Sequence, residues 1–254
     1  GHYEEALKYF EQMQCEFSPN LITFLCILKA CSAIVSIDKG REIHDTILTR
    51  GFDQDLFLGN TLVDLYAKSG AFIEAQHIFN TLSVRDVVSW NSLISVHAQV
   101  GESEIVFHTF DKMVGEGKKP NLVTFLSVLN VCNHGGLVNK GQMYFEAMHK
   151  AYNLNPTLEH YTCMIDLLGR AGQLDHALMA IEDKFPFHPD NVTWSTMLSA
   201  CRKWGNVDLG KHAFQHVLQL NDKEDGAYTC MCNIYIDAKG SQCKNVEEAH
   251  LYRL

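Results

Sequence analysis

The sequence lacks long hydrophobic runs and is poor in cations, and each shortage excludes a class of protein. The longest apolar segments, such as 21–30, contain polar residues such as Thr23 and Lys29 and fall short of the ~18 residues that a membrane-spanning helix needs. The 21 Lys and Arg residues against 30 Asp and Glu residues give a formal net charge of −9. A surface that is basic overall and binds nucleic acid without discrimination is therefore excluded. A polyanionic partner would have to be held by a local stripe of cations.

Disorder is also excluded, because 46% of the residues are hydrophobic and only 20% are charged. The nine cysteines are an odd number in a chain too long for a disulfide-stapled module, and several lie in apolar helical stretches. This usage predicts a reducing compartment. The sequence begins with Gly1, and its first residues are typical of the middle of a helical unit. We therefore expect a fragment or a processed chain, in which a targeting peptide would not be visible.

Glycines recur at a nearly constant spacing, which indicates an internal repeat. Successive members of the series are 31, 35, 36, 33 and 35 residues apart, and only Val35 interrupts it. Four of the five prolines also precede an apolar or β-branched run in the same way. The glycines are Gly70, Gly101, Gly136, Gly172, Gly205 and Gly240, and the prolines are Pro19, Pro120, Pro156 and Pro189.

Each unit divides into two helical periods around its glycine, as in 56–69 followed by 71–82. The glycine supplies a left-handed cap before a tight antiparallel turn, and a small residue such as Ala75, five positions later, lets the helices approach closely. No alternation typical of strands competes. Helix pairs that cannot bury an apolar face alone must stack, so we expect an all-α solenoid. Such a fold favours long ligands, either extended peptides or single-stranded nucleic acid.

The units resemble pentatricopeptide repeats of the plant PLS subfamily rather than tetratricopeptide repeats. LFLGNTLVDLYAKSG resembles an S-type repeat, VVSWNSLISVHAQVG a P-type repeat, LITFLCILKACS and LVTFLSVLNVCNHGG L-type repeats, and VTWSTMLSACRKWGNVDLG an E motif. The resemblance implies a right-handed superhelix that binds RNA in a mitochondrion or a chloroplast, the former favoured, most often to select sites for cytidine-to-uridine editing. The implied order is a partial repeat (1–20), L (21–55), S (56–86), P (87–121), L (122–157), last S (158–190), first E motif (191–225) and a second, incomplete or divergent E motif (226–254).

The resemblance implies that each repeat reads one nucleotide through its fifth and last residues. Amides, hydroxyls and carboxylates at these positions can pair with the edge of an unstacked base. The implied pairs are Asn60 with Asp86 for U, Asn91 with Asn121 for a pyrimidine (Y), and Thr162 with Asp190 for G. The L-type repeats, which place Leu25 and Leu126 at the fifth position, are expected to be spacers or protein-contact repeats. The predicted target is therefore U-Y-N-G-N-N-N-C. The alternative for each pair is local structure, because Asn and Asp are also common helix caps and turn residues.

Two further sets of contacts follow from the resemblance. Phe57 and Val88, at the second position of their repeats, are expected to sandwich bases, a role that Glu159 does not suit. At the thirteenth position, Lys68, Arg170 and Lys203 are expected to contact phosphate. The alternative for these three is a favourable charge near a helix C-terminus.

Catalytic chemistry is not expected in this chain. Family members that edit by themselves carry a zinc deaminase signature, His-x-Glu with Pro-Cys-x-x-Cys; His2 and Glu4 match the first part by spacing alone, and no Cys-x-x-Cys exists. His212 and His216 can share a metal, but no nearby carboxylate or thiol is expected to complete a site.

We therefore expect no cofactor, no metal and no small-molecule substrate. A deaminase domain or other editing factors would act from a missing segment or another chain, through L-type repeats and E motifs. The alternative function is a protein–protein scaffold without base reading, which the net charge and the leucines of the L-type repeats favour.

Overall fold

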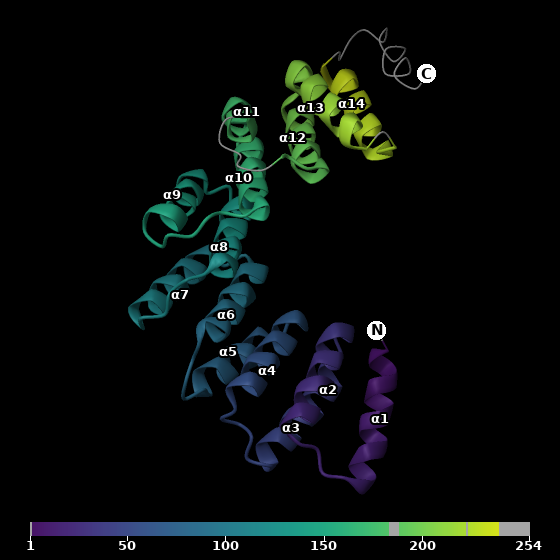
Figure 1. The fold of residues 1–254 in the computed structure, drawn as a ribbon, viewed down its shortest axis with the longest axis vertical. Helices are drawn as coiled ribbons and strands as arrows, with labels where there is room; N and C mark the ends of the chain where they lie inside the picture. Colours follow the sequence, from purple (N-terminus) through teal and green to yellow (C-terminus); the bar gives the residue numbers. More distant parts are fainter. Residues whose placement is uncertain (1, 183–187, 222, 239–254) are drawn as a thin grey trace. The chain divides into compact units, whose positions relative to one another are not determined.

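The computed structural model of the chain describes residues 2–182, 188–221 and 223–238 and consists, over these residues, of helices joined by short turns (Figure 1). The expected all-α helical-repeat solenoid is confirmed, while the hand of its superhelix stays a prediction. The helices are α1 (Tyr3–Glu16), α2 (Leu21–Ile34), α3 (Ile37–Thr49), α4 (Leu56–Lys68), α5 (Phe72–Thr81), α6 (Val87–Val100), α7 (Ser103–Gly115), α8 (Leu122–His134), α9 (Val138–Lys150), α10 (Leu158–Arg170), α11 (Leu174–Glu182), α12 (Asn191–Trp204), α13 (Val207–Leu220) and α14 (Asp225–Ala238).

The first helix of each pair starts where a side chain caps it. Asn20, Asp55, Asp86 and Asp190 each accept a hydrogen bond from the backbone N–H three residues later, at 2.8–3.0 Å. Such a cap satisfies one of the N–H groups that a helix start leaves unpaired. Helices α2, α4, α6, α8, α10 and α12 consequently begin at the residues with which the repeats are expected to open. The assignment of each unit to a repeat type stays a prediction, and residues 239–254 of the expected second E motif lie outside the described residues.

The turn inside each pair uses the left-handed backbone expected of its glycine. Gly101 ends α6 with φ +81°, and Gly70, Gly136, Gly172 and Gly205 have φ between +64° and +79°. Val35 takes the same conformation, with φ +56°, at the one place where the glycine is missing. The turn therefore imposes its conformation even on a β-branched residue. Gly240 lies outside the described residues.

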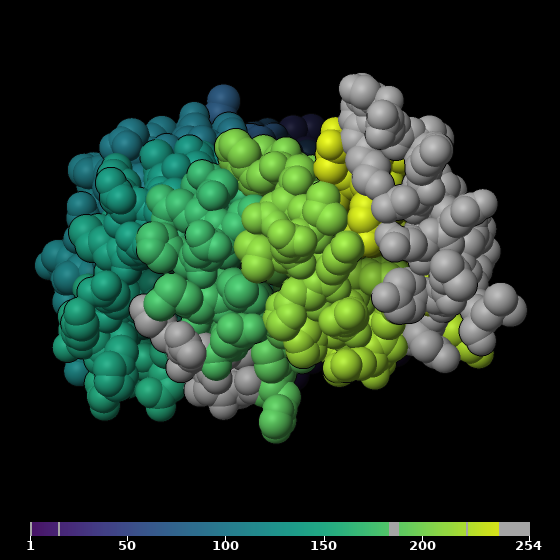
Figure 2. All heavy atoms as spheres, turned by 90° about the horizontal axis from the view of Figure 1, so that it is seen from above, coloured from purple at the N-terminus to yellow at the C-terminus, as the bar shows by residue number. Residues whose placement is uncertain are grey.

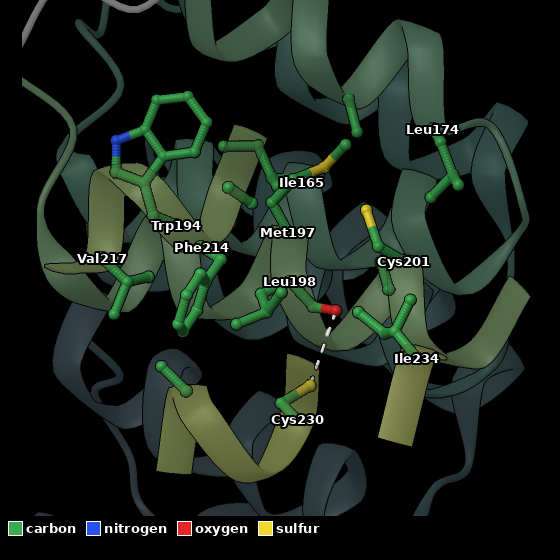
Figure 3. Packing of buried hydrophobic residues seen from close by; sticks show 14 of the residues in the cluster. Ile165, Leu174, Trp194, Met197, Leu198, Cys201, Phe214, Val217, Cys230 and Ile234 are labelled. Atoms are coloured by element: carbon green, nitrogen blue, oxygen red, sulfur yellow. Dashed lines mark hydrogen bonds between the residues drawn. The ribbon is translucent and has the colours of Figure 1, made fainter. Parts of the chain in front are cut away.

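The chain forms two compact units, residues 1–127 and 128–254. In the second unit, buried side chains from α10 to α14 form one apolar cluster around Trp194, Leu198 and Cys201 (Figure 3). The thiol of Cys230 donates a hydrogen bond to the carbonyl of Leu198 across this cluster, at 3.7 Å. In the space-filling view of Figure 2, the colours of this unit run in chain order from teal through green to yellow.

Small residues bring successive helices close together. A Cβ atom on Gly40 would lie 2.5 Å from Leu65 Cδ2, and one on Gly141 would lie 2.4 Å from Leu167 Cδ2. Both glycines are members of the small-residue series that follows the turn glycines. The expected approach was between the two paired helices of a unit, whereas these tightest contacts are with the first helix of the next unit, α4 or α10.

None of the described helices is both long and apolar enough to cross a membrane. The described cysteines are free thiols, and five of them are buried. Burial raises the pKa of Cys163 and of Cys201 to about 12. These thiols are therefore protonated and inert near neutral pH.

Candidate RNA-binding site

The fifth and last residues of the expected S-type repeat meet in the structure. Asn60 lies in the second turn of α4, and its Nδ2 donates a hydrogen bond to Asp86 Oδ1, at the start of α6, over 3.2 Å. Only 8% of Asn60 is exposed, and its Oδ1 has no hydrogen-bond partner among the described residues. A buried amide with an unpaired acceptor is costly unless a ligand completes it.

Asp86 also caps α6, in addition to its bond with Asn60. Its carboxylate accepts from the backbone and hydroxyl of Ser89, and the Ser89 hydroxyl accepts from the Asp86 backbone in return, which makes a capping box. Burial raises the pKa of Asp86, but the hydrogen bonds from Ser89, Asn60 and Val88 outweigh it, so the pKa lies below its ordinary value. The carboxylate is therefore charged at neutral pH and faces the Asn60 amide.

The corresponding pair in the next unit is also joined directly. Asn91 Nδ2 donates to Asn121 Oδ1 over 3.1 Å, and Asn91 is 8% exposed. The Thr124 hydroxyl donates to Asn91 Oδ1 and also lies 3.0 Å from Asn121 Oδ1. Both oxygens of this pair are therefore engaged, whereas Asn60 keeps one acceptor open.

The third expected pair is not joined by a direct hydrogen bond among the described residues. The Thr162 hydroxyl donates to the Leu158 carbonyl of its own helix over 2.9 Å. Its Oγ1 lies 3.4 Å from Thr193 Oγ1, which donates to Asp190 Oδ1 over 2.7 Å. Thr193 therefore lies between Thr162 and Asp190, but both hydroxyl protons are already donated elsewhere, so no hydrogen bond joins the two threonines.

The two units expected to be L-type present no such pair among the described residues. Leu25 and Leu126 are half-buried, and their side chains offer no hydrogen bond. The last residues of these units are helix caps: Asp55 caps α4, and Thr157 forms a capping box with His160.

The residues expected to sandwich bases are exposed apolar side chains at helix starts. Phe57 is 66% exposed and Val88 is 55% exposed, and Glu159 is also exposed. Three residues that sequence reasoning did not single out occupy the same second position in their units. These exposed residues are Ile22, Val123 and Val192. An apolar residue directly after each helix start is the signal that finds them.

The three expected phosphate contacts all have partners in the free protein. Lys68 Nζ lies 2.8 Å from Asp64 Oδ2, and Arg170 Nε lies 2.9 Å from Asp166 Oδ2. Lys203 Nζ donates to the carbonyl of Arg170 over 2.8 Å and lies 5.2 Å from the ring centre of Trp204. Sequence reasoning missed the two carboxylates, although their i, i+4 spacing from the cations is a signal for such pairs.

One expectation about the histidines is wrong. A carboxylate does lie near these histidines, because Glu182 Oε1, at the end of α11, lies 3.1 Å from His212 Nε2. His216 instead stacks on Trp194, with ring centres 4.0 Å apart. The described residues contain no group of three or more side chains arranged to hold a metal ion.

Family models match the chain at several places. A model of the PPR repeat family matches residues 85–134, and a model of the PPR repeat matches 60–87, 159–183 and 192–220. The chain belongs to the PPR repeat family. It spans a little over a third of the length of the curated relatives described next.

Curated relatives of this PPR chain come from a plant. A mitochondrial pentatricopeptide repeat-containing protein of Arabidopsis thaliana is 40% identical over 244 residues, which are 96% of this chain and 38% of the relative. The chloroplastic CRR2 of the same plant is 39% identical over 242 residues, 94% of this chain and 37% of the relative.

Solved structures agree with the fold. PPR10 in complex with an 18-nt psaJ RNA element is similar with a TM-score of 0.77 at 20% identity, over 99% of this chain and 37% of that one. The PPR domain of Arabidopsis thaliana PRORP1 in complex with tRNA has a TM-score of 0.55 at 18% identity, over 68% of this chain and 94% of that one.

Proposed function

We propose that this PPR chain binds single-stranded RNA and reads one base in each non-L repeat. The observation that carries the proposal is the direct hydrogen bond between the fifth and last residues of two consecutive units, Asn60 to Asp86 and Asn91 to Asn121. Each bond holds two polar groups together, one on the first helix of a unit and one at the start of the first helix of the next unit. A base edge that met them would find donors and acceptors already oriented.

The proposed target is U-Y-N-G-N-N-N-C, with Thr162 and Asp190 reading the G. Phe57 and Val88, exposed at the helix starts, would stack against the bases, and Lys68, Arg170 and Lys203 would contact phosphates. Asn60 supports this most clearly, because its buried Oδ1 has no partner in the described part of the chain and a uracil N–H would supply one.

The proposed role is that of a site-recognition factor for cytidine-to-uridine editing in a mitochondrion or a chloroplast. The PLS order of repeats and the E motifs support this role, and relatives named as mitochondrial and chloroplastic support the location. The chain would choose the site, and a deaminase domain in the same protein or another chain would change the base.

The test is binding of short single-stranded RNAs at moderate salt, with each informative base changed in turn. Each mismatch should weaken binding by a factor of about 5–150, the range for a good base-edge contact. Equal binding of all the RNAs would contradict base reading. It would favour the second candidate, a scaffold for proteins, which the net charge of −9 supports.

A further inference from the structure

The same three-membered polar network is built at both junctions between an L-type unit and the S-type unit that follows it. At the first junction, the Ser32 hydroxyl and the Lys68 ammonium both donate to Asp64 Oδ2, over 2.9 and 2.8 Å. At the second junction, Asn133 Nδ2 and Arg170 Nε both donate to Asp166 Oδ2, over 2.7 and 2.9 Å.

The two networks share their geometry but not their residues. The donors from the L-type units, Ser32 and Asn133, are buried, whereas the carboxylates and cations are partly exposed. The donor is a hydroxyl in one network and an amide in the other, and the cation is a lysine in one and an arginine in the other. What recurs is a carboxylate held by a buried group of the preceding unit and turned toward a cation on its own helix.

This step rests on the proposed function, that the chain binds RNA. In that complex, each carboxylate lies beside a cation that is expected to bind an RNA phosphate. A phosphate that approaches Lys68 must share its ammonium with Asp64 and meets a like charge a few ångströms away. The same holds for Arg170 and Asp166. Phosphate contact at these positions therefore contributes less than a free cation would.

We infer that Asp64 and Asp166 restrain phosphate binding, so that stable binding depends on base reading. RNA that the repeats cannot read then gains little from its backbone and dissociates. Ser32 and Asn133 act as positioning residues, because they hold these two carboxylates beside the cations. The L-type units thereby have a role although their leucines read no base.

The first test is the double variant Asp64→Asn/Asp166→Asn, which keeps the side-chain shape and removes both charges. Exposed ion pairs are worth a factor of about 1.4–5 each, so affinity should rise about 2–25-fold. The rise should be the same for U-Y-N-G RNA and for RNA with its informative bases changed. The matched control is Glu146→Gln, which removes a carboxylate paired at i, i+4 with Lys150 on α9, the second helix of its unit, and should change affinity less than twofold.

The second test decides whether each carboxylate acts through its own cation. Asp64→Asn should raise affinity in the parent protein but not in the Lys68→Ala background. An equal gain in both backgrounds would overturn the inference, since it would mean that the carboxylate repels RNA through long-range charge alone. So would a protein that discriminates bases but gains nothing from either substitution.

Two results keep these outcomes separate from other failures. If the parent protein binds all RNAs equally, the proposed base reading has failed, whatever the carboxylates do. If Asp64→Asn lowers the thermal midpoint of the protein, Ser32→Ala provides the second variant. It keeps the charge of Asp64 and removes the hydrogen bond that holds this carboxylate in place. A smaller gain in the same direction is expected, and no gain from Ser32→Ala would count against the inference.

Discussion

One residue of this chain, Asp86, combines a role in folding with a place in the proposed recognition site. Asp86 caps α6 through Ser89 and also accepts the Asn60 amide, so a helix cap and a candidate base-reading group are the same carboxylate. The two interpretations of Asp86, local structure and RNA reading, are therefore compatible. The cap fixes the carboxylate in the direction that the Asn60 amide needs.

Asp86→Ala should lower the free energy of unfolding by about 1–2 kcal/mol, because it removes the cap of α6 and leaves the Asn60 amide unpaired. Urea denaturation at pH 7 measures this difference. Asp111→Ala, which removes an exposed carboxylate on α7, is the control and should change the free energy of unfolding by less than about 0.5 kcal/mol.

The same pair of proteins gives a pH test. The pKa of Asp86 is lowered in the folded state, so its stabilising effect is present above the ordinary value of 3.8 and is lost as the pH falls through the lower folded-state value. The stability difference between the parent and Asp86→Ala should therefore stay constant from pH 7 to pH 5 and shrink below pH 3.8. A difference that grows toward acid pH would contradict the account of this carboxylate.

At the residue scale, the sequence positions predict which side chains gather but not every bond between them. Asn60 and Asn91 reach their partners directly, while Thr162 donates within its own helix and only lies near Thr193, which bonds Asp190. The pairing of Lys68 with Asp64 is local, and its i, i+4 spacing could have predicted it. The bond from Ser32 to Asp64 joins residues 32 positions apart, and only the stacking of α2 on α4 brings them together.

At the scale of the element, helix starts were predictable and close helix contacts were less so. A capping residue followed by an apolar run is a local signal, which is why α4 and α6 begin at the expected residues. The spacing of helices depends on which side chains face each other. Gly169 shows this, because a Cβ atom there would lie 2.6 Å from the Cβ of Ala200 on the next unit.

Gly169→Ala should therefore force α10 away from α12. The clash is with a Cβ atom fixed to the backbone, which no side-chain rotation relieves, so a loss of about 1–3 kcal/mol in the free energy of unfolding is expected. Thermal or urea unfolding measures it. Gly226→Ala, near the start of α14, has only an ordinary contact at 3.7 Å and should not lower the stability. Equal stability of the two variants would mean that α10 and α12 are not packed as closely as described.

At the scale of the whole molecule, the charge of −9 restricts RNA contact to a few cations. Lys68 and Arg170 are each paired with an acid, so in the proposed complex the backbone of the RNA would gain little from them. On that proposal, the acidic chain would select RNA through its bases. The repeat length and the fold class followed from glycine and proline spacing, whereas this charge pairing needed the structure.

Lys68→Ala should weaken every RNA by the same factor, because phosphate contacts carry no sequence information. The slope of log affinity against log salt should become shallower by up to about 0.7, the value for one phosphate on a single strand. Titrations at several salt concentrations measure both. Lys150→Ala on α9 is the matched control and should leave the slope unchanged; a base-dependent loss for Lys68→Ala would contradict a phosphate role.

The central claim is that the fifth residue of a repeat, with its last residue, selects the base. Thr162→Asn recreates at the last S-type unit the combination found in Asn60 and Asp86, with Asp190 unchanged. The direct measurement is the affinity of parent and variant for two RNAs that carry G or U at that one position. The account predicts that the parent prefers G and the variant prefers U, each by a factor of about 5–150. An unchanged preference, in a variant that still folds and binds, would contradict it.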